Sequence, residues 1–291
     1  MKEIQAELLI DSQCVIAEGP VYDEDCNGLY WTDFKRGTLH FLDLDGGAHN
    51  ELTIRRNLGC FVLTDRGRIL AGLDDGVYFL DRVRCIPLCK PAEASRPTVR
   101  FNDGKCDPAG RFVLGTATSE NASGRGALFS VTGKDEYKLL CDGLGCSNGL
   151  AWSLDRKTMY HIDTLLARPS DVCAFDYDVE TGAATNRRKV LDYTEQAKAG
   201  VLPDGMTIDR DGNLWIAEWG GYGVSCWDPR TGEKLAHVSV PVKCVSCCTF
   251  GGKNLDRLFI TTAGGDDPHS GGVFYADVGV SGFPAARFRE A

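Results

Sequence analysis

The chain has 291 residues, 43% of them hydrophobic, which is enough to bury a core in one large domain or two ordinary ones. It carries 41 acidic against 32 basic residues, for a net charge of −9, and no basic run interleaved with aromatic residues. Because such a surface repels phosphate backbones, we expect no nucleic-acid partner. No stretch approaches the roughly 18 apolar residues of a membrane helix, so we expect no membrane partner either.

The N-terminal twenty residues carry acids within their only apolar run, which is atypical of a signal peptide. The 13 cysteines are odd in number and scattered along the chain. A secreted protein usually pairs its cysteines, whereas an intracellular one can keep them as small buried hydrophobic residues. We therefore expect a cytoplasmic protein with reduced thiols. We also expect it to be a monomer.

The first predicted element is a strand at Glu3–Ile10. Six segments with one shared order of elements follow: an apolar strand, an Asp/Gly turn, a second strand, and at least one further strand. The segments begin, 42 to 56 residues apart, at Glu18, Cys60, Asn102, Asn148, Asp204 and Ser246. This pattern predicts an all-β fold, a six-bladed β-propeller with four-stranded antiparallel blades. The six units fill the chain, so we expect a single domain over residues 1–291.

The two ends of the chain are expected to close the ring. Glu3–Ile10 has no blade of its own, so we expect it to join the last blade beside Gly272–Val278. The longest spacing between units predicts an insertion around Leu191–Val201. Within it, Tyr193–Ala199 is the best candidate for a helix.

The acidic run Asp209–Asn213 resembles the first half of an EF-hand calcium loop. It lacks the closing glutamate, and strand residues follow it directly. We therefore interpret it as the first hairpin turn of the fifth unit, with Asp and Gly supplying turn geometry. Asp204 lies at the other end of the strand that leads into this turn.

Residues equivalent to Asp204 occur in every unit, five positions before the turn. Because the first strand of each blade lines the central channel, these residues are expected to form a ring at one mouth of it. The ring comprises Glu18, Cys60, Asn102, Asn148, Asp204 and Ser246. Converging carboxylates and carboxamides repel one another or remain unsatisfied, and a hard divalent cation resolves this by taking their oxygens as ligands. The alternative is that they cap strand ends by bonding neighbouring amides.

Several runs resemble the regucalcin/gluconolactonase family, also called senescence marker proteins. They are AEGPVYD (Ala17–Asp23), RFNDGKCDPAGR (Arg100–Arg111), CSNGLAWSLD (Cys146–Asp155), NRRKV (Asn186–Val190), LPDGMTID (Leu202–Asp209) and SCCTFGGKN (Ser246–Asn254). The resemblance covers nearly the whole chain in order. It implies a six-bladed propeller that binds one divalent metal on its axis and hydrolyses sugar lactones.

The resemblance also implies roles for particular residues. The metal ligands would be Glu18, Asn148 and Asp204, which all belong to the ring obtained from spacing. Contacts to substrate hydroxyls would come from Arg100, Asn102 and Glu120. The loop around Glu120, residues 116–130, differs from regucalcin in length and composition, and we expect it to form a lid. The cofactor would be one divalent cation, with Ca²⁺ expected first and Zn²⁺, Mg²⁺, Mn²⁺ or Fe²⁺ as alternatives.

These residues suit a gluconolactonase-like hydrolase that opens aldonolactones to aldonic acids. The cation would polarise the lactone carbonyl or hold the attacking water, with Asp204 as ligand and general base. Arg100 and Asn102 would bond sugar hydroxyls and stabilise charge developing on oxygen. No G-x-S-x-G or H-E-x-x-H motif is present, and the histidines, including His40 and His49, are expected to be structural or exposed.

Three other functions remain open from the sequence. The first is a calcium-binding regulatory protein of the regucalcin type, which would use the same site without turnover. The second is a non-catalytic binding propeller, and the third is a related hydrolase acting on organophosphates or other lactones. The expected partner is a small sugar lactone, with gluconolactone, galactonolactone, arabinonolactone and xylonolactone all compatible with the residues.

Overall fold

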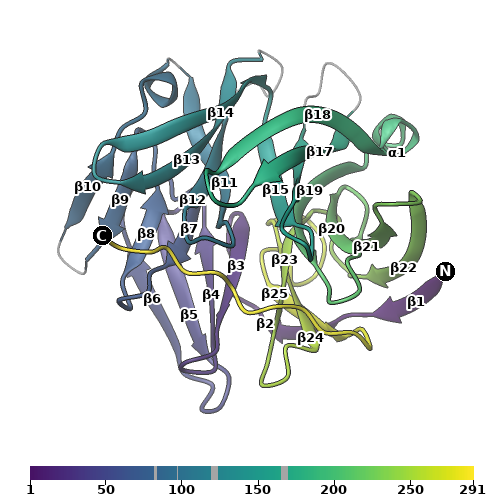
Figure 1. Cartoon of the computed structure of the whole chain (residues 1–291). Helices are drawn as coiled ribbons and strands as arrows, with labels where there is room; N and C mark the ends of the chain where they lie inside the picture. Colours follow the sequence, from purple (N-terminus) through teal and green to yellow (C-terminus); the bar gives the residue numbers. More distant parts are fainter. Residues whose placement is uncertain (82–83, 97, 119–123, 165–169) are drawn as a thin grey trace.

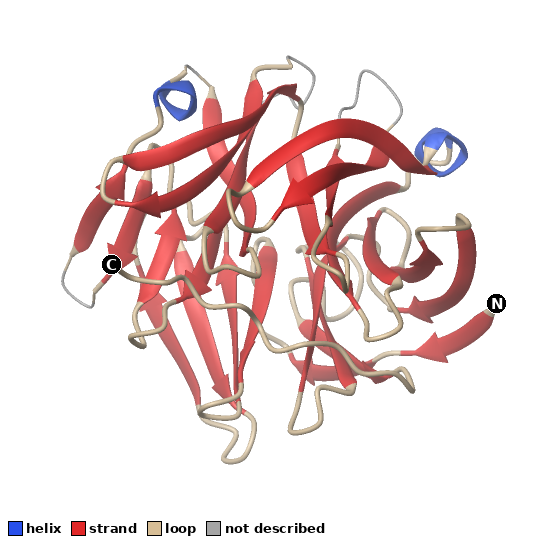
Figure 2. Cartoon of the chain, viewed as in Figure 1, coloured by secondary structure: helices blue, strands red, loops and turns tan. Residues whose placement is uncertain are grey.

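Six β-sheets are arranged around a common axis in the computed structural model, which describes residues 1–81, 84–96, 98–118, 124–164 and 170–291 (Figure 2). Each sheet is a blade whose strands follow one another along the chain, from the axis outwards. The first blade consists of β3 (Ala17–Asp23), β4 (Gly28–Asp33), β5 (Thr38–Asp43) and β6 (His49–Thr53). The second consists of β7 (Cys60–Leu63), β8 (Ile69–Gly72), β9 (Val77–Leu80) and β10 (Cys85–Cys89). The third consists of β11 (Val99–Cys106), β12 (Phe112–Thr118), β13 (Gly126–Gly133) and β14 (Glu136–Leu144).

The remaining three blades repeat this order. The fourth blade consists of β15 (Ser147–Trp152), β16 (Thr158–Asp163), β17 (Asp171–Asp178) and β18 (Ala183–Asp192). The fifth consists of β19 (Leu202–Ile208), β20 (Leu214–Trp219), β21 (Gly223–Asp228) and β22 (Glu233–Ser239). The sixth begins with β23 (Val245–Gly251), β24 (Arg257–Thr262) and β25 (Val273–Asp277). Each innermost strand contacts those of both neighbouring blades, in the order β3, β7, β11, β15, β19, β23 and back to β3. The predicted six-bladed propeller is thereby confirmed.

The N-terminal strand closes the ring differently from the prediction. The segment expected as one strand at Glu3–Ile10 forms two, β1 (Lys2–Gln5) and β2 (Glu7–Ile10). β2 pairs antiparallel with β25 in the sixth blade, as expected, but β1 pairs parallel with β22 as a fifth strand of the fifth blade. The reason is packing, since Ile4 and Ala6 lie against the hydrophobic cluster between these two blades.

Helical structure is confined to two short elements within the described residues. The predicted helix is confirmed as α1 (Thr194–Lys198), and a 3₁₀ turn, η1 (Ala92–Ser95), precedes β11. Neither element, nor any other helix in the described part of the chain, has the length and apolar character that crossing a bilayer requires.

Buried aspartates hold the inner hairpins of two blades. Asp209 is fully buried and accepts hydrogen bonds from the backbone N–H groups of Asp211 and Asn213 and from the Trp215 indole, at 2.8–3.0 Å. Gly212 follows with a φ of +86°, which favours glycine. The prediction of a hairpin turn, and not a calcium loop, is therefore confirmed. Asp107 occupies the corresponding place in the third blade.

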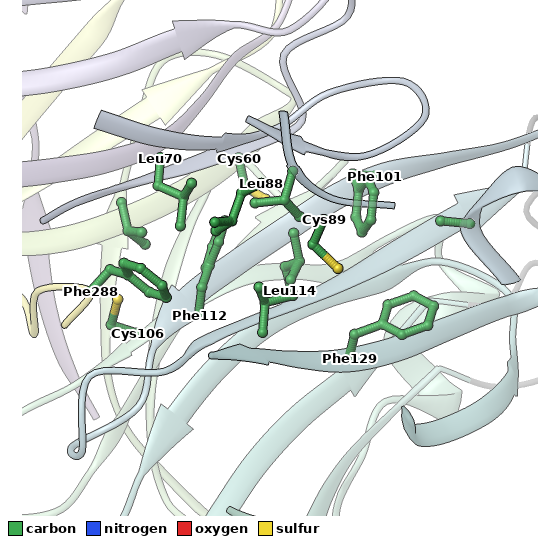
Figure 3. Packing of buried hydrophobic residues seen from close by; sticks show 14 of the residues in the cluster. Cys60, Leu70, Leu88, Cys89, Phe101, Cys106, Phe112, Leu114, Phe129 and Phe288 are labelled. Carbon is green, nitrogen blue, oxygen red and sulfur yellow. The ribbon is translucent and has the colours of Figure 1, made fainter. Parts of the chain in front are cut away.

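The C-terminal segment after β25 crosses one face of the ring (yellow in Figure 1). Its backbone bonds the fifth, second and third blades: the N–H of Arg210 donates to Ser281, that of Phe288 to Leu63, and that of Arg289 to Gly110. Phe288 enters the hydrophobic cluster between the second and third blades, as Figure 3 shows. The tail thus stabilises the packing of blades that are distant from it in sequence.

The hydrophobic core lies between adjacent blades. In the cluster of Figure 3, Cys60 and Leu70 of the second blade pack with Phe101, Phe112 and other residues of the third. All 13 cysteines lie in described residues, and none is bonded to another. Most are buried, which agrees with the expectation of cysteine as a packing residue.

Candidate functional site

Four of the predicted ring residues lie at bulges in the innermost strands. In β11, β15 and β19, two residues face one on the partner strand, and the first of each pair is Asn102, Asn148 or Asp204. β3 has a similar bulge immediately after Glu18. Because bulged residues leave the sheet ladder, their side chains can be turned toward the channel. The regular strand pattern alone does not predict this feature.

Glycine follows three of these residues, for two different reasons. A Cβ atom on Gly149 would lie 2.8 Å from the carbonyl oxygen of Asp204, and one on Gly205 would overlap Cys247. Only Gly19, after Glu18, has a positive φ, of +53°. Close approach accounts for Gly149 and Gly205, and backbone geometry accounts for Gly19.

A chain of hydrogen bonds links the third, fourth and fifth blades through the site. Arg100 donates to Oδ1 of Asn102 at 2.6 Å, and Nδ2 of Asn102 donates to Oδ1 of Asn148 at 2.6 Å. Nδ2 of Asn148 donates to Thr164, whose hydroxyl donates to the carbonyl of Pro203 at 2.7 Å. Because the Thr164 hydroxyl gives its only hydrogen to Pro203, it can only accept from Asn148. The amide nitrogen of Asn148 therefore faces Thr164, and its amide oxygen faces Asn102 and the channel.

Glu18 and Asp204 form an acidic centre beside this chain. Burial, with a contribution from the charge of Asp103, raises the pKa of Glu18 to about 8. Burial and the charges of Glu18 and Asp103 raise the pKa of Asp204 well above its ordinary value, and Arg100 opposes the rise. The charge of Glu18 thus acts on Asp204 from the first blade to the fifth, and that of Asp103 acts on both carboxylates.

Two residues of the site were not predicted from the sequence. Asp103 lies in the β11 bulge with Asn102, and its own pKa is raised by burial despite the nearby Lys105. The run Asn-Asp-Gly in the sequence could have indicated Asp103 as a second acidic residue of the site. In a regular strand, however, Asp103 would point to the opposite face from Asn102, and it is the bulge that allows both to face the site. Thr164, which orients Asn148, follows β16 and carries no sequence signal.

Other predicted residues do not join the centre. Ser246 is buried and donates to the carbonyl of Ala17 in the next blade at 2.5 Å, so it has the capping role that was the alternative for the ring. Cys60 is buried beside the channel, where burial raises the pKa of its thiol. Glu120, the third predicted substrate contact, lies outside the described residues.

Arg100 lies beside the carboxylates, with its guanidinium 4.3 Å from the centre of the Phe34 ring. Burial lowers the pKa of Arg100, while the charges of Glu18 and Asp204 oppose that effect. A cavity of about 450 Å³ begins at Gly19 and Asp103 and extends to the C-terminal tail at residues 283–286. Arg100, Asn148 and Asp204 are not among the described residues that line this cavity.

The donor set of the centre suits a hard divalent cation. Glu18 and Asp204 supply carboxylate oxygens, and Asn148 supplies an amide oxygen whose direction is fixed by Thr164. Oxygen donors of this kind are those that Ca²⁺ and Mg²⁺ prefer. A cation would also favour the ionised form of both carboxylates, which burial and, to a lesser extent, neighbouring carboxylates disfavour. The residues present therefore fit the group that the resemblance implies.

The raised pKa values predict how stability depends on pH when divalent cations are chelated. The folded state keeps a proton on Glu18 up to about pH 8, whereas an unfolded glutamate loses it near pH 4.5. Between these values the folded state binds more protons, so the free energy of unfolding should fall as pH rises, and Asp204 acts in the same direction. Urea unfolding of chelated protein at pH 5 and pH 8 measures this fall.

Two companion measurements test the cause. Saturating Ca²⁺ should remove most of the decline, and Glu18→Gln should flatten it in chelated protein. A stability that rises over this window, or a decline that Glu18→Gln leaves intact, would contradict the assignment.

Known proteins resemble this chain over nearly its full length. The family model described as "SMP-30/Gluconolactonase/LRE-like region" matches residues 16–264. YvrE of Bacillus subtilis, a proposed sugar lactone lactonase, is 32% identical over 294 residues, covering 98% of this chain and 99% of that protein. The chain belongs to the SMP-30/gluconolactonase/LRE-like family. The resemblance noted in the sequence is thereby confirmed.

Other members of the SMP-30/gluconolactonase/LRE-like family carry different names. Human regucalcin is 34% identical over 297 residues, with 97% of both chains covered. The pentonolactonase XacC of Haloferax volcanii is 34% identical over 300 residues, with 96% of both chains covered. The crystal structure of regucalcin from Agrobacterium tumefaciens, described as a calcium-binding protein, superimposes with a TM-score of 0.90 at 24% identity, covering 99% of this chain and 98% of that one. The latter likeness supports the fold.

Proposed function

We propose that this protein is a divalent-cation-dependent hydrolase that opens sugar lactones to aldonic acids. The observation that carries the proposal is the pair of carboxylates, Glu18 and Asp204, held with raised pKa values beside the inward amide oxygen of Asn148 and the cationic Arg100. Relatives named as a lactonase and a pentonolactonase support the substrate class. A cytoplasmic location and a monomeric state remain part of the proposal.

Glu18, Asn148 and Asp204 would hold the cation. When bound, a divalent cation supplies Lewis acidity, which polarises a carbonyl and lowers the pKa of water. Asp204 is the group we assign to the proton transfer: its carboxylate accepts the proton of the attacking water and returns it to the ring oxygen as the ester bond breaks. Asp204 is the first of the two bulged residues of β19, and its side chain is buried.

Arg100 and Asn102 form a polar wall for the sugar. Both amide hydrogens of Asn102 are used, by Ser147 and Asn148, while among the described residues its oxygen accepts only from Arg100, which leaves one lone pair for a sugar hydroxyl. Within the described part of the chain, Arg100 donates through one nitrogen, to Asn102 and Phe101, which leaves its other N–H groups for a substrate oxygen. The wall therefore offers both a donor and an acceptor, as recognition of hydroxyl groups requires.

This polar wall favours an enzyme over a pure calcium-binding regulator, because an ion sensor does not need hydroxyl contacts. The activity test is proton release from a panel of gluconolactone, galactonolactone, arabinonolactone and xylonolactone. At least one lactone should be opened well above its spontaneous rate, and chelation followed by dialysis should abolish turnover until cation is restored. Turnover that survives complete chelation would remove the cation from the proposal, and no turnover with any lactone would favour the regulator.

A further inference from the structure

A second group of metal-ligating side chains lies away from the axis, at the seam where the ring closes. The segment joining β2 of the sixth blade to β3 of the first carries Cys14. The backbone N–H of Cys14 donates to the carbonyl of Gly271 in the sixth blade at 3.0 Å. The next N–H, that of Val15, donates to Asp33 in the first blade at 2.9 Å. Cys14 is thus held between the first and last blades.

Three buried side chains of different chemistry meet at this point. The Cys14 sulfur lies 3.6 Å from Nε2 of His40, and an oxygen of Asp33 completes a group whose ligand atoms all lie within 4.8 Å of one another. Their exposed fractions are 2%, 3% and 0%. They come from the closing segment, from β5 and from the end of β4, so the fold and not local sequence brings them together.

The spacing of sulfur and nitrogen matches ligands of one tetrahedral ion. With a zinc–sulfur bond of about 2.3 Å and a zinc–nitrogen bond of about 2.0–2.1 Å, tetrahedral angles place the two ligand atoms about 3.6 Å apart. Asp33 accepts three N–H contacts, from Val15 and from the backbone and side chain of Arg36. A carboxylate has about four acceptor positions, so one remains for a metal.

The surroundings resemble those of a metal-bound histidine. Nδ1 of His40, the nitrogen turned away from Cys14, lies 3.1 Å from His49 and 3.5 Å from the Glu51 carboxylate. Such partners fix the ring and its tautomer so that the other nitrogen is free to bind a metal. The fully buried Trp31 stacks on His40 at 5.1 Å and lies close enough to Cys14 to lower the pKa of its thiol. An ionised sulfur at Cys14 would accept a hydrogen bond from the Trp31 indole N–H.

We propose that Cys14, His40 and Asp33 form a zinc site that fastens the seam of the propeller. Sulfur and imidazole ligands select Zn²⁺ over Ca²⁺ or Mg²⁺, whereas the axial oxygens suit the harder cations, so the two sites differ in chemistry. The seam joins the N-terminal segment to the first and sixth blades. An ion there stabilises the closed ring and the segment that leads to Glu18, four residues beyond Cys14.

A catalytic role for Cys14 fits less well. Burial raises the pKa of its thiol to about 11, with Asp33 adding to the rise and Ser12 and Trp31 opposing it. A nucleophilic cysteine needs a lowered pKa and access to substrate. A bound cation is compatible with both the raised pKa and the burial of Cys14, because it displaces the thiol proton and needs no open surface.

Cobalt substitution tests this site in the full-length, reduced protein. Co²⁺ bound through a thiolate gives a near-ultraviolet charge-transfer band, which the sulfur-free axial site cannot produce. Metal-free wild type titrated with Co²⁺ should develop the band, and Zn²⁺ should remove it. Cys14→Ser should abolish it, whereas the control Cys26→Ser, which changes an exposed cysteine, and the axial variant Asp204→Asn should retain it.

Thermal unfolding gives a second readout if Cys14→Ser folds poorly. Zn²⁺ should raise the melting temperature of wild type and of Asp204→Asn by several degrees, and His40→Gln should lose this increment in the Asp204→Asn background. Absence of a thiolate band in folded, reduced wild type would overturn the proposal. So would a band that persists in Cys14→Ser. Neither result bears on lactone hydrolysis, which is measured separately.

Discussion

Asp204→Asn is expected to lower kcat/KM for the preferred lactone by roughly 10³-fold, because it removes a cation ligand and the proposed general base together. The same substitution should raise the stability of chelated protein. Asp204 sits among Glu18 and Asp103, whose charges act against its ionised form. Asparagine keeps the shape of the side chain and removes that repulsion.

The combination of lost activity and gained stability separates a functional carboxylate from a structural one. Activity is measured by proton release, and stability by urea unfolding near pH 8 with chelator present. The matched control is Asp211→Asn, an exposed aspartate in the hairpin of the same blade. It should change neither quantity. An Asp204→Asn variant with undiminished turnover would disprove the assigned role.

Asp107→Ala should have the opposite signature, with a loss of roughly 3–5 kcal/mol in the free energy of unfolding and no change in kcat per folded molecule. Asp107 is fully buried, where it bonds the Arg111 guanidinium at 2.7 Å and the Tyr177 hydroxyl at 2.5 Å. It also accepts the backbone N–H groups of Ala109 and Arg111. Truncation leaves a cation and several donors without their acceptor.

Urea unfolding measures this loss, and lactone turnover below the unfolding transition checks that the site is intact. Asp155→Ala is a suitable control, since Asp155 lies in the corresponding turn of the fourth blade but is exposed. It should cost less than about 1 kcal/mol. A comparable loss at both positions would mean that burial of the Asp107 network contributes little.

The six blades were predictable because each repeats the same strands and turns, and because turn residues such as Asp107 and Asp209 mark the repeat in the sequence. The division of the N-terminal strand was not predictable in this way. Alternation identifies a strand but does not say which sheet edge it joins, and the fifth and sixth blades both offer an open edge to Glu3–Ile10. Contacts of Ile4 and Ala6 across the two blades decide the outcome.

The candidate site was only partly accessible from the sequence for a related reason. Counting back from the turns located Glu18, Asn102, Asn148 and Asp204, since these residues share one position in the repeat. Asp103 was not predicted, because regular alternation along a strand turns neighbouring side chains to opposite faces, and the bulge in β11 interrupts that alternation. The group of Cys14, His40 and Asp33 was not predicted, because these residues do not share a position in the repeat and only the closed ring brings them together.

The divided N-terminal strand has a consequence for the order of events during synthesis. β1 and β2 leave the ribosome before β22 and β25, the strands on which they pair, which are made more than 200 residues later. Until then both segments are unpaired edges, open to wrong partners in neighbouring chains. Pairing over such long separations is slow. We therefore expect the early blades to assemble while the nascent chain is still growing, and the ring to close only once β22 and β25 have been made.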